Sequence, residues 1–297
     1  MASSIICIEE GGHGTLDGTS LGIHSNLRCF LESITPIVKA HRVPNAPYLS
    51  LSNNYCANIT EGGKYYYLGD LWNRFYEWST CGVGTSVCIA PGEKMVQYFV
   101  PYLSAIQLYT NRTMVPTSQR CNGYNHHGVI NEMDTNGYQS QSHMSDELLF
   151  KYFEHGSPYE RVPFVDKVYE LSYDYPSLTS LRSVDISPSS WMSIFWYPTS
   201  HVPTKNKKDM DTCFLTYHIL STFEEIVALD IVHASDHVAL APFGLATYKL
   251  DSKVWASTNS SDQEHIATLF DAAHSWLRKK NIYHHDFNYF SHRCSSR

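Results

Sequence analysis

Apolar residues recur at the helical spacing in four stretches of the chain. Leu68, Leu71, Trp72 and Phe75 follow the i, i+3, i+4, i+7 pattern, and Gly82 predicts the end of that helix. Three more helices are predicted: one from a Ser145 cap to Gly156, one from Pro163 through Leu171, and one from the capping box of Ser261 and Glu264 through Leu277.

Other runs have the composition of strands. Met95–Val100, Tyr102–Tyr109 and Trp191–Tyr197 are apolar on both faces, as strands covered by helices should be, and Pro101 marks an edge, bend or bulge. Leu245–Leu250 and Lys253–Ser257 flank Asp251 and Ser252 and predict a hairpin. We therefore expect an α+β fold, with a central, mostly antiparallel sheet packed by several helices. The strands expected in it are Met95–Val100, Trp191–Tyr197, Thr212–Ile219 and Leu245–Leu250.

Polar stretches divide the chain into parts. Residues 1–25 are rich in Gly, Ser and Thr and are expected to be disordered, and 293–297 form a short tail. Residues 112–145 hold few large apolar side chains and are expected to be a flexible loop inside a single domain of residues 26–292. The alternative is a linker between two domains. The loop interpretation is favoured because the strands before it would otherwise lack partners.

Aromatic content strengthens the expectation of a packed core. The chain has 297 residues with 21 Tyr, 13 Phe and 6 Trp, many of them in dense blocks. Rings at that density bury a large area and exclude a disordered chain. Six side chains on apolar faces are expected to be buried in one core: Trp72, Phe75, Phe99, Trp196, Phe270 and Leu277.

The net charge and the cysteine content limit which partners the protein can bind and in which compartment of the cell it is expected. The net charge is −7 with 17% charged residues, which argues against broad binding to nucleic acid. Eight cysteines without a C-x-x-C pair are typical of reduced thiols in an intracellular protein. No signal peptide and no apolar run of membrane-spanning length is evident. We expect a cytoplasmic or nuclear protein that is neither secreted nor membrane-spanning.

Two short segments carry most of the candidate chemistry. His284, His285 and Asp286 follow a predicted helix, and imidazole beside carboxylate could bind zinc or share a proton. The alternative is that these side chains satisfy backbone groups. The second segment is a turn-rich connector whose His155, Tyr159, Glu160 and Arg161 are candidates for binding. Its alternative is a structural turn that directs one helix toward the next.

Three weaker motifs fail their structural context. Gly18–Gly22 matches a nucleophile elbow but lacks the strand and helix that the chemistry requires. His233 and His237 have zinc-protease spacing, yet Ala234 stands where the general-base Glu is needed. Lys205–Lys208 forms a small basic patch that is best explained as a solvated turn.

Several blocks together resemble one family. They are Leu68–Trp72, Val96–Gln107, Tyr152–Pro163, Lys205–His218, Pro242–Lys249 and Ser275–Phe287. These blocks are similar to the plant domain of unknown function 789 family, from about Asn26 to about Phe290. The similarity weakens across Arg112–Ser145 and Glu224–Ala241. The resemblance implies a plant protein with one family domain. It implies no reaction, because the family has no established catalytic or ligand residues to carry over.

Three functions remain open. The first is a non-catalytic adaptor or scaffold that binds another protein, with no cofactor and no metal, through the His155–Arg161 turn or the Tyr283–Asp286 corner. The absence of a complete catalytic constellation and the tyrosine surplus favour it. The second is an enzyme of unknown chemistry that uses His284, His285 and Asp286. The third is a weak nucleic-acid binder, disfavoured by the net charge. No membrane partner is expected.

Overall fold

The computed structural model describes residues 25–42, 64–90, 93–110, 146–199, 212–222, 236–256 and 260–294. Six strands form one antiparallel sheet in the order β10-β8-β7-β5-β4, and β6 also pairs with β5. These strands are β4 (Val83–Ala90), β5 (Glu93–Thr110), β6 (Glu147–Phe153), β7 (Trp191–Thr199), β8 (Cys213–Ile219) and β10 (Gly244–Tyr248). The sheet contains the four runs that the sequence predicted for it, and the α+β class is confirmed.

Two small antiparallel pairs lie outside this sheet. β1 pairs with β9, and β2 pairs with β3. Their bounds are β1 (Ile37–Lys39), β2 (His41–Arg42), β3 (Lys64–Tyr65) and β9 (His237–Ala239).

β5 is the strand around which the large sheet is built. One of its edges pairs with β7. The other carries β4 along residues 93–99 and β6 along residues 105–110. The sequence predicted two strands separated at Pro101, but one strand of 18 residues runs through it. Pro101 is tolerated because it falls between the stretches paired with β4 and with β6, where a missing N–H costs little.

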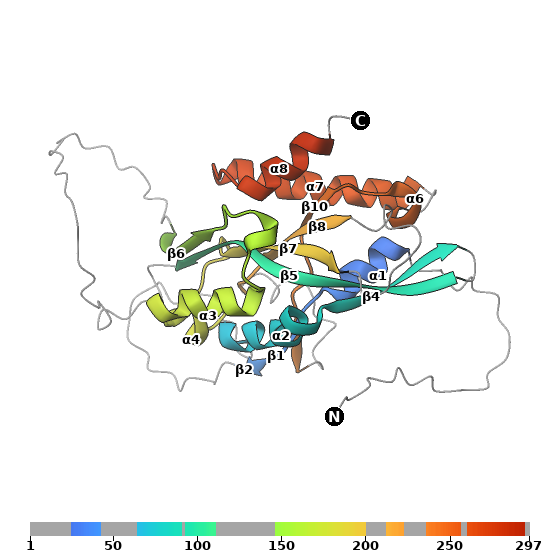
Figure 1. Cartoon of the computed structure of the whole chain (residues 1–297). Coiled ribbons are helices and arrows are strands. Elements are labelled where there is room, and N and C mark those ends of the chain that lie inside the picture. The colour runs from blue at the N-terminus through green and yellow to red at the C-terminus, as the bar shows by residue number, and fades with distance from the viewer. Residues whose placement is uncertain are drawn as a thin grey trace, which may run out of the picture.

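Helices cover both faces of the sheet. In Figure 1, α7 and α8 lie above the strands, whereas α2, α3 and α4 lie below them. The helices are α1 (Asn26–Ser33), α2 (Leu68–Cys81), α3 (Phe164–Asp174), α4 (Ser177–Ser180), α6 (Ser252–Trp255), α7 (Ser260–Lys279) and α8 (His285–Cys294). A 3₁₀ turn, η3 (Pro158–Glu160), precedes α3. Among the described residues, no helix has both the length and the apolar composition that a bilayer crossing requires.

The buried side chains form two clusters, one on each face of the sheet. One cluster, which we call the lower core, lies between the sheet and α1, α2 and α3, and the other, the upper core, lies between the sheet and α7 and α8. The lower core contains Trp72, Phe75, Phe99 and Trp196. The upper core contains Leu277, and the partly buried Phe270 packs against this cluster. The expectation of a single core was therefore wrong for this pair. The two clusters explain why β7 is apolar on both faces.

The three helices with a clear apolar period are confirmed. α2 ends at Gly82, whose φ of 76° suits glycine. α3 begins directly after Pro163, as predicted. α7 is also present, but it begins at Ser260, so Ser261 lies within the helix and not at its cap. α1 was missed, although Leu27, Phe30, Leu31 and Ile34 follow the helical spacing and Ser25 caps it by accepting from the N–H of Arg28.

Two local predictions were wrong. The helix expected after Ser145 is strand β6, because its residues pair with the end of β5. The hairpin expected around Asp251 is absent from this described stretch, since Asp251 instead caps α6 by accepting from the N–H of Lys253. This short helix turns Trp255 into the lower core.

Some predictions fall outside the described residues. They concern residues 1–24 with the Gly18–Gly22 motif, the whole 112–145 loop, the Lys205–Lys208 patch and His233. The expected tail begins inside α8, which runs to Cys294.

Candidate functional site

The two segments that the sequence singled out separately lie against each other. The connector from His155 to Arg161 joins β6 to α3, and His285 begins α8. Arg161 and Asp286, which are 125 positions apart, form a two-armed ion pair with both N–O distances at 2.7 Å. Their side chains are only 2% and 6% exposed. The connector is therefore fixed to the start of α8 by a buried salt bridge.

The surroundings of this pair favour the ionised form of the Asp286 carboxyl. Two nitrogens of Arg161 donate to the carbonyl oxygen of Gly156, at 3.1 and 2.9 Å, and its guanidinium lies 5.2 Å from the ring centre of Phe195. Burial by itself would raise the pKa of the Asp286 carboxyl, but the hydrogen bonds and charge of Arg161, with help from Ser104, bring that pKa below its ordinary value. Asp286 is thus an ionised, acceptor-only group.

A chain of hydrogen bonds continues from Asp286 into the upper core. Ser104 Oγ lies 2.5 Å from Asp286 Oδ2 and 3.0 Å from His284 Nε2. His284 Nδ1 lies 2.7 Å from the hydroxyl of Tyr217. Ser104 and Tyr217 are fully buried, and His284 is 1% exposed. We call Arg161, Asp286, Ser104, His284 and Tyr217 the buried network.

One assignment of protons satisfies every member of the buried network. Ionised Asp286 can only accept, so Ser104 donates its hydroxyl proton to it. Ser104 then accepts from Nε2–H of His284, and His284 Nδ1 accepts from Tyr217. This neutral tautomer agrees with the pKa of His284, which burial lowers to about 4.

The β5 backbone places Ser104 in this network. The pairing with β7 shifts between Leu103 and Ala105, which leaves Ser104 as the extra residue of a β-bulge. Leu103 and Ile106 belong to the lower core and Ala105 to the upper core. Ser104 and Ala105 therefore both face α7 and α8. The sequence singled out neither Ser104 nor Tyr217, and a bulge leaves no mark in the apolar pattern.

The network resembles a catalytic triad in composition but not in arrangement. A nucleophilic serine passes its proton to histidine, and the carboxylate orients that histidine. Here the Ser104 proton points to Asp286, and Ser104 accepts from His284. A substrate would also need to reach side chains that are almost wholly buried. The geometry suits a rigid structural link better than covalent catalysis.

Exposed side chains surround this link. Five residues contribute exposed side chains there: His155, Glu160, Val162 (38% exposed), Tyr283 (72%) and His285 (side chain 44%). The rings of His155 and His285 are 6.0 Å apart, which joins the two segments at the surface. We call these five residues the His155 surface. Tyr159 belongs to η3, but its side chain lies outside the description.

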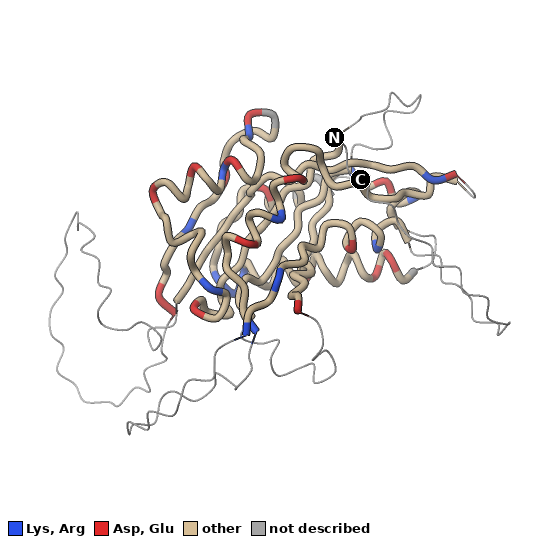
Figure 2. Tube along the Cα trace, turned by 90° about the horizontal axis from the view of Figure 1, so that it is seen from below, with Lys and Arg blue, Asp and Glu red and all other residues tan. Residues whose placement is uncertain are grey.

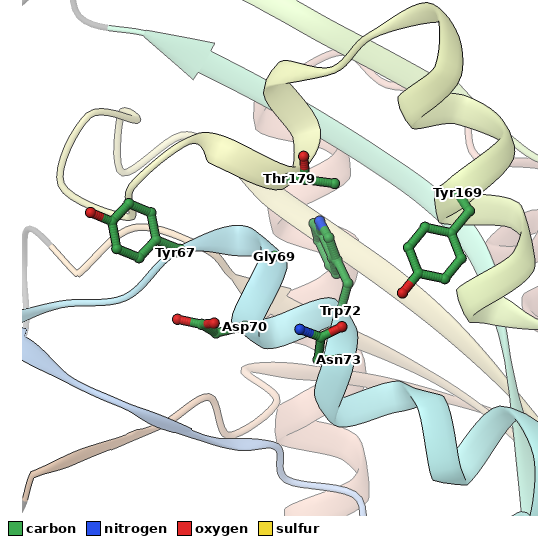
Figure 3. Close-up of a pocket in the computed structure, with 7 residues that line it drawn as sticks. All are labelled: Tyr67, Gly69, Asp70, Trp72, Asn73, Tyr169 and Thr179. Carbon is green, nitrogen blue, oxygen red and sulfur yellow. The ribbon is translucent and has the colours of Figure 1, made fainter.

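A second feature lies on the opposite face of the sheet, between α2, α3 and α4. It is a groove of about 410 Å³. Its lining residues are Tyr67, Gly69, Asp70, Trp72, Asn73, Tyr169 and Thr179. Figure 3 shows Tyr67 and Tyr169 on its two sides with Trp72 between them. We call it the tyrosine groove. The sequence contains no motif that marks it.

Metal ligation has little support among the described residues. No group of three or more His, Cys, Asp or Glu lies close enough to hold an ion there. His237 is exposed in β9.

Comparison with known proteins supplies a family and no activity. The family model described as "Protein of unknown function (DUF789)" matches residues 25–290. No curated protein matches the chain. No solved structure matches it.

Proposed function

The chain belongs to the DUF789 family, and from this premise we propose that it is a non-catalytic adaptor or scaffold of plant cells that binds another protein inside the cell through the His155 surface. The observation that carries the proposal is the buried ion pair between Arg161 and Asp286. The groups with catalytic potential are engaged in buried contacts around this pair, and aromatic and imidazole side chains remain exposed above it.

A fixed surface is an advantage in binding. Association loses affinity whenever a loop or a side chain must be ordered in the complex. The connector is already ordered by the Arg161 hydrogen bonds to Gly156, and Glu154 adds two more by accepting from the N–H groups of His155 and Gly156. Tyr283 supplies ring area with a hydroxyl that tolerates water, as is typical of partner-facing residues.

Proximity labelling in plant cells tests the proposal with the full chain. A triple variant, His155→Ala with Tyr283→Ala and His285→Ala, removes exposed side chains and leaves the buried network intact. We expect it to lose proteins that the wild type labels while its thermal unfolding stays unchanged. The matched control is Ile89→Ala with Val96→Ala, which removes exposed apolar side chains from β4 and β5. An unchanged set of labelled proteins in the triple variant would refute the His155 surface as the contact.

The rival function is an enzyme, which the proximity of Ser104, His284 and Asp286 favours. A fluorophosphonate probe, which reacts with activated serines, separates the two functions. The adaptor proposal expects no labelling of Ser104. Labelling that disappears in Ser104→Ala would overturn it. Stoichiometric zinc or iron in the purified protein, lost in His284→Ala with His285→Ala, would overturn it as well.

A further inference from the structure

The tyrosine groove has the lining of a site for an organic cation. Tyr67 and Tyr169 are 36% and 47% exposed and lie on opposite sides of the groove. The Tyr67 ring also packs against the rings of His41 and Tyr65, at 5.3 and 5.6 Å between ring centres, which holds it in place. Trp72 closes the base, where its indole nitrogen donates to the carbonyl oxygen of Leu178 at 2.6 Å. Aromatic faces attract ammonium and guanidinium groups because the ring quadrupole is negative on the face.

The groove carries a negative charge, which complements a positively charged ligand. Asp70 is the one charged residue among the seven that line it, and its side chain is 44% exposed. His41 lies beside it, with 3.6 Å between His41 Nε2 and Asp70 Oδ2. Two nearby cations are already engaged, since Arg182 binds Asp185 and Lys167 binds Glu170. The Asp70 carboxylate is therefore accessible to a cation from outside.

The surroundings extend this negative potential along two helices. α2 exposes Glu77, and α3 exposes Asp166, Glu170 and Asp174. Figure 2 shows the molecule from the side on which α2 and α3 cover the sheet. Carboxylates on both helices outnumber the cations Arg74 and Lys167, and Arg74 lies over the ring of Trp78. The carboxylates on α2 and α3 favour a chain with several positive charges.

We infer that the tyrosine groove binds a lysine or arginine side chain presented by a basic segment of a partner protein. The cation would lie between Tyr67 and Tyr169 with Asp70 as its counter-charge. The flanking carboxylates would bind further positive residues of the same segment. This contact is built from residues other than those of the His155 surface, and it holds whether or not that surface binds a partner.

Calorimetric titration of the full chain with a short arginine–glycine peptide tests the inference. Tyr169→Ala removes one wall, and we expect it to weaken binding about two- to thirty-fold, the range of cation–π contacts. Asp70→Asn should also weaken binding and reduce its dependence on salt, because one screened charge pair is lost. The same peptide with citrulline in place of arginine keeps the shape without the charge and should bind far more weakly. Tyr289→Ala, which removes an exposed ring from α8 on the other face of the sheet, is the matched control and should bind like the wild type.

Several outcomes would overturn the inference. They are no binding of the arginine peptide by the wild type, equal binding of the citrulline peptide, or unchanged affinity in both Tyr169→Ala and Asp70→Asn. Dimerisation of the wild type that Tyr169→Ala abolishes would assign the groove to a second copy of the chain instead. Failure of the His155 surface appears only in the labelling experiment with His155→Ala, Tyr283→Ala and His285→Ala, so the two proposals fail separately.

Discussion

Ser104 shows how much a single residue depends on its strand. Successive side chains of a regular strand point to opposite faces, so Ser104 and Ala105 could not both reach α7 and α8 without the bulge. The residue types at 155–161 and 284–286 marked both segments as candidates from the sequence. Their pairing was not predictable, because Arg161 and Asp286 are 125 positions apart and only the tertiary packing of the connector against α8 brings them together. The bulge likewise arises from pairing between strands and not from local sequence.

Removing one partner of the buried ion pair should be costly. In Arg161→Met the Asp286 carboxylate stays buried without its cation, and the carbonyl of Gly156 loses its donors. We expect the free energy of unfolding to fall by about 3–5 kcal/mol in urea denaturation. The double variant Arg161→Met with Asp286→Leu should recover much of this loss, because no isolated charge remains.

The exposed pair of Arg28 and Glu32 provides the control. Their side chains are 64% and 55% exposed, and Arg28→Met should change stability by less than about 1 kcal/mol. Equal effects of Arg28→Met and Arg161→Met would contradict the buried state of the second pair.

Elements with one apolar face were predictable, and elements defined by their neighbours were not. α2, α3 and α7 carry their period in the sequence. β6 has apolar residues that fit a helix or a strand equally well, and its pairing with β5 decides the outcome. α8 was not predicted from the sequence, because the polar residues at its start were interpreted as a ligand cluster. Phe287 and Phe290 nevertheless share one face of this helix.

The approach of α2 to α4 predicts an unusual effect of a helix-favouring substitution. A Cβ at Gly69 would lie 2.6 Å from the carbonyl oxygen of Thr179, and a backbone atom cannot easily move away. Gly→Ala within a helix ordinarily gains up to about 1 kcal/mol. We expect Gly69→Ala instead to lose about 1–3 kcal/mol in thermal unfolding, because the two elements must separate. Thr80→Ala, at an exposed position of the same helix, should stay near wild type. A stabilised Gly69→Ala would show that α4 yields easily.

For the whole molecule, two buried histidines predict sensitivity to acid. His218 hydrogen-bonds the carbonyl oxygen of Leu240 below the sheet, and His284 lies above it. Burial lowers the pKa of both imidazoles to about 4, whereas the unfolded chain binds their protons near the ordinary value of 6.5. Between these values the unfolded state holds more protons. The free energy of unfolding should therefore decrease as pH falls from 6.5 to 4, by about 3 kcal/mol for each histidine.

Urea denaturation at a series of pH values measures this slope. His218→Gln and His284→Gln should each flatten it, and the double variant should flatten it most. Thr80→Ala changes an exposed residue that does not titrate and should leave the slope as in the wild type. A wild-type stability that does not change between pH 6.5 and 4 would contradict the burial of both rings.

The buried ion pair also imposes an order on biosynthesis. Arg161 leaves the ribosome 125 residues before the carboxylate that neutralises it. Until Asp286 has emerged, closing the sheet around the guanidinium would strand an uncompensated charge, so that region of the nascent chain stays open. The pairing of β5 is delayed in the same way, because its partner β7 is translated later. The contact between the connector and α8 therefore forms only after residue 286 has been synthesised, and until then the aromatic side chains that it covers are exposed to aggregation.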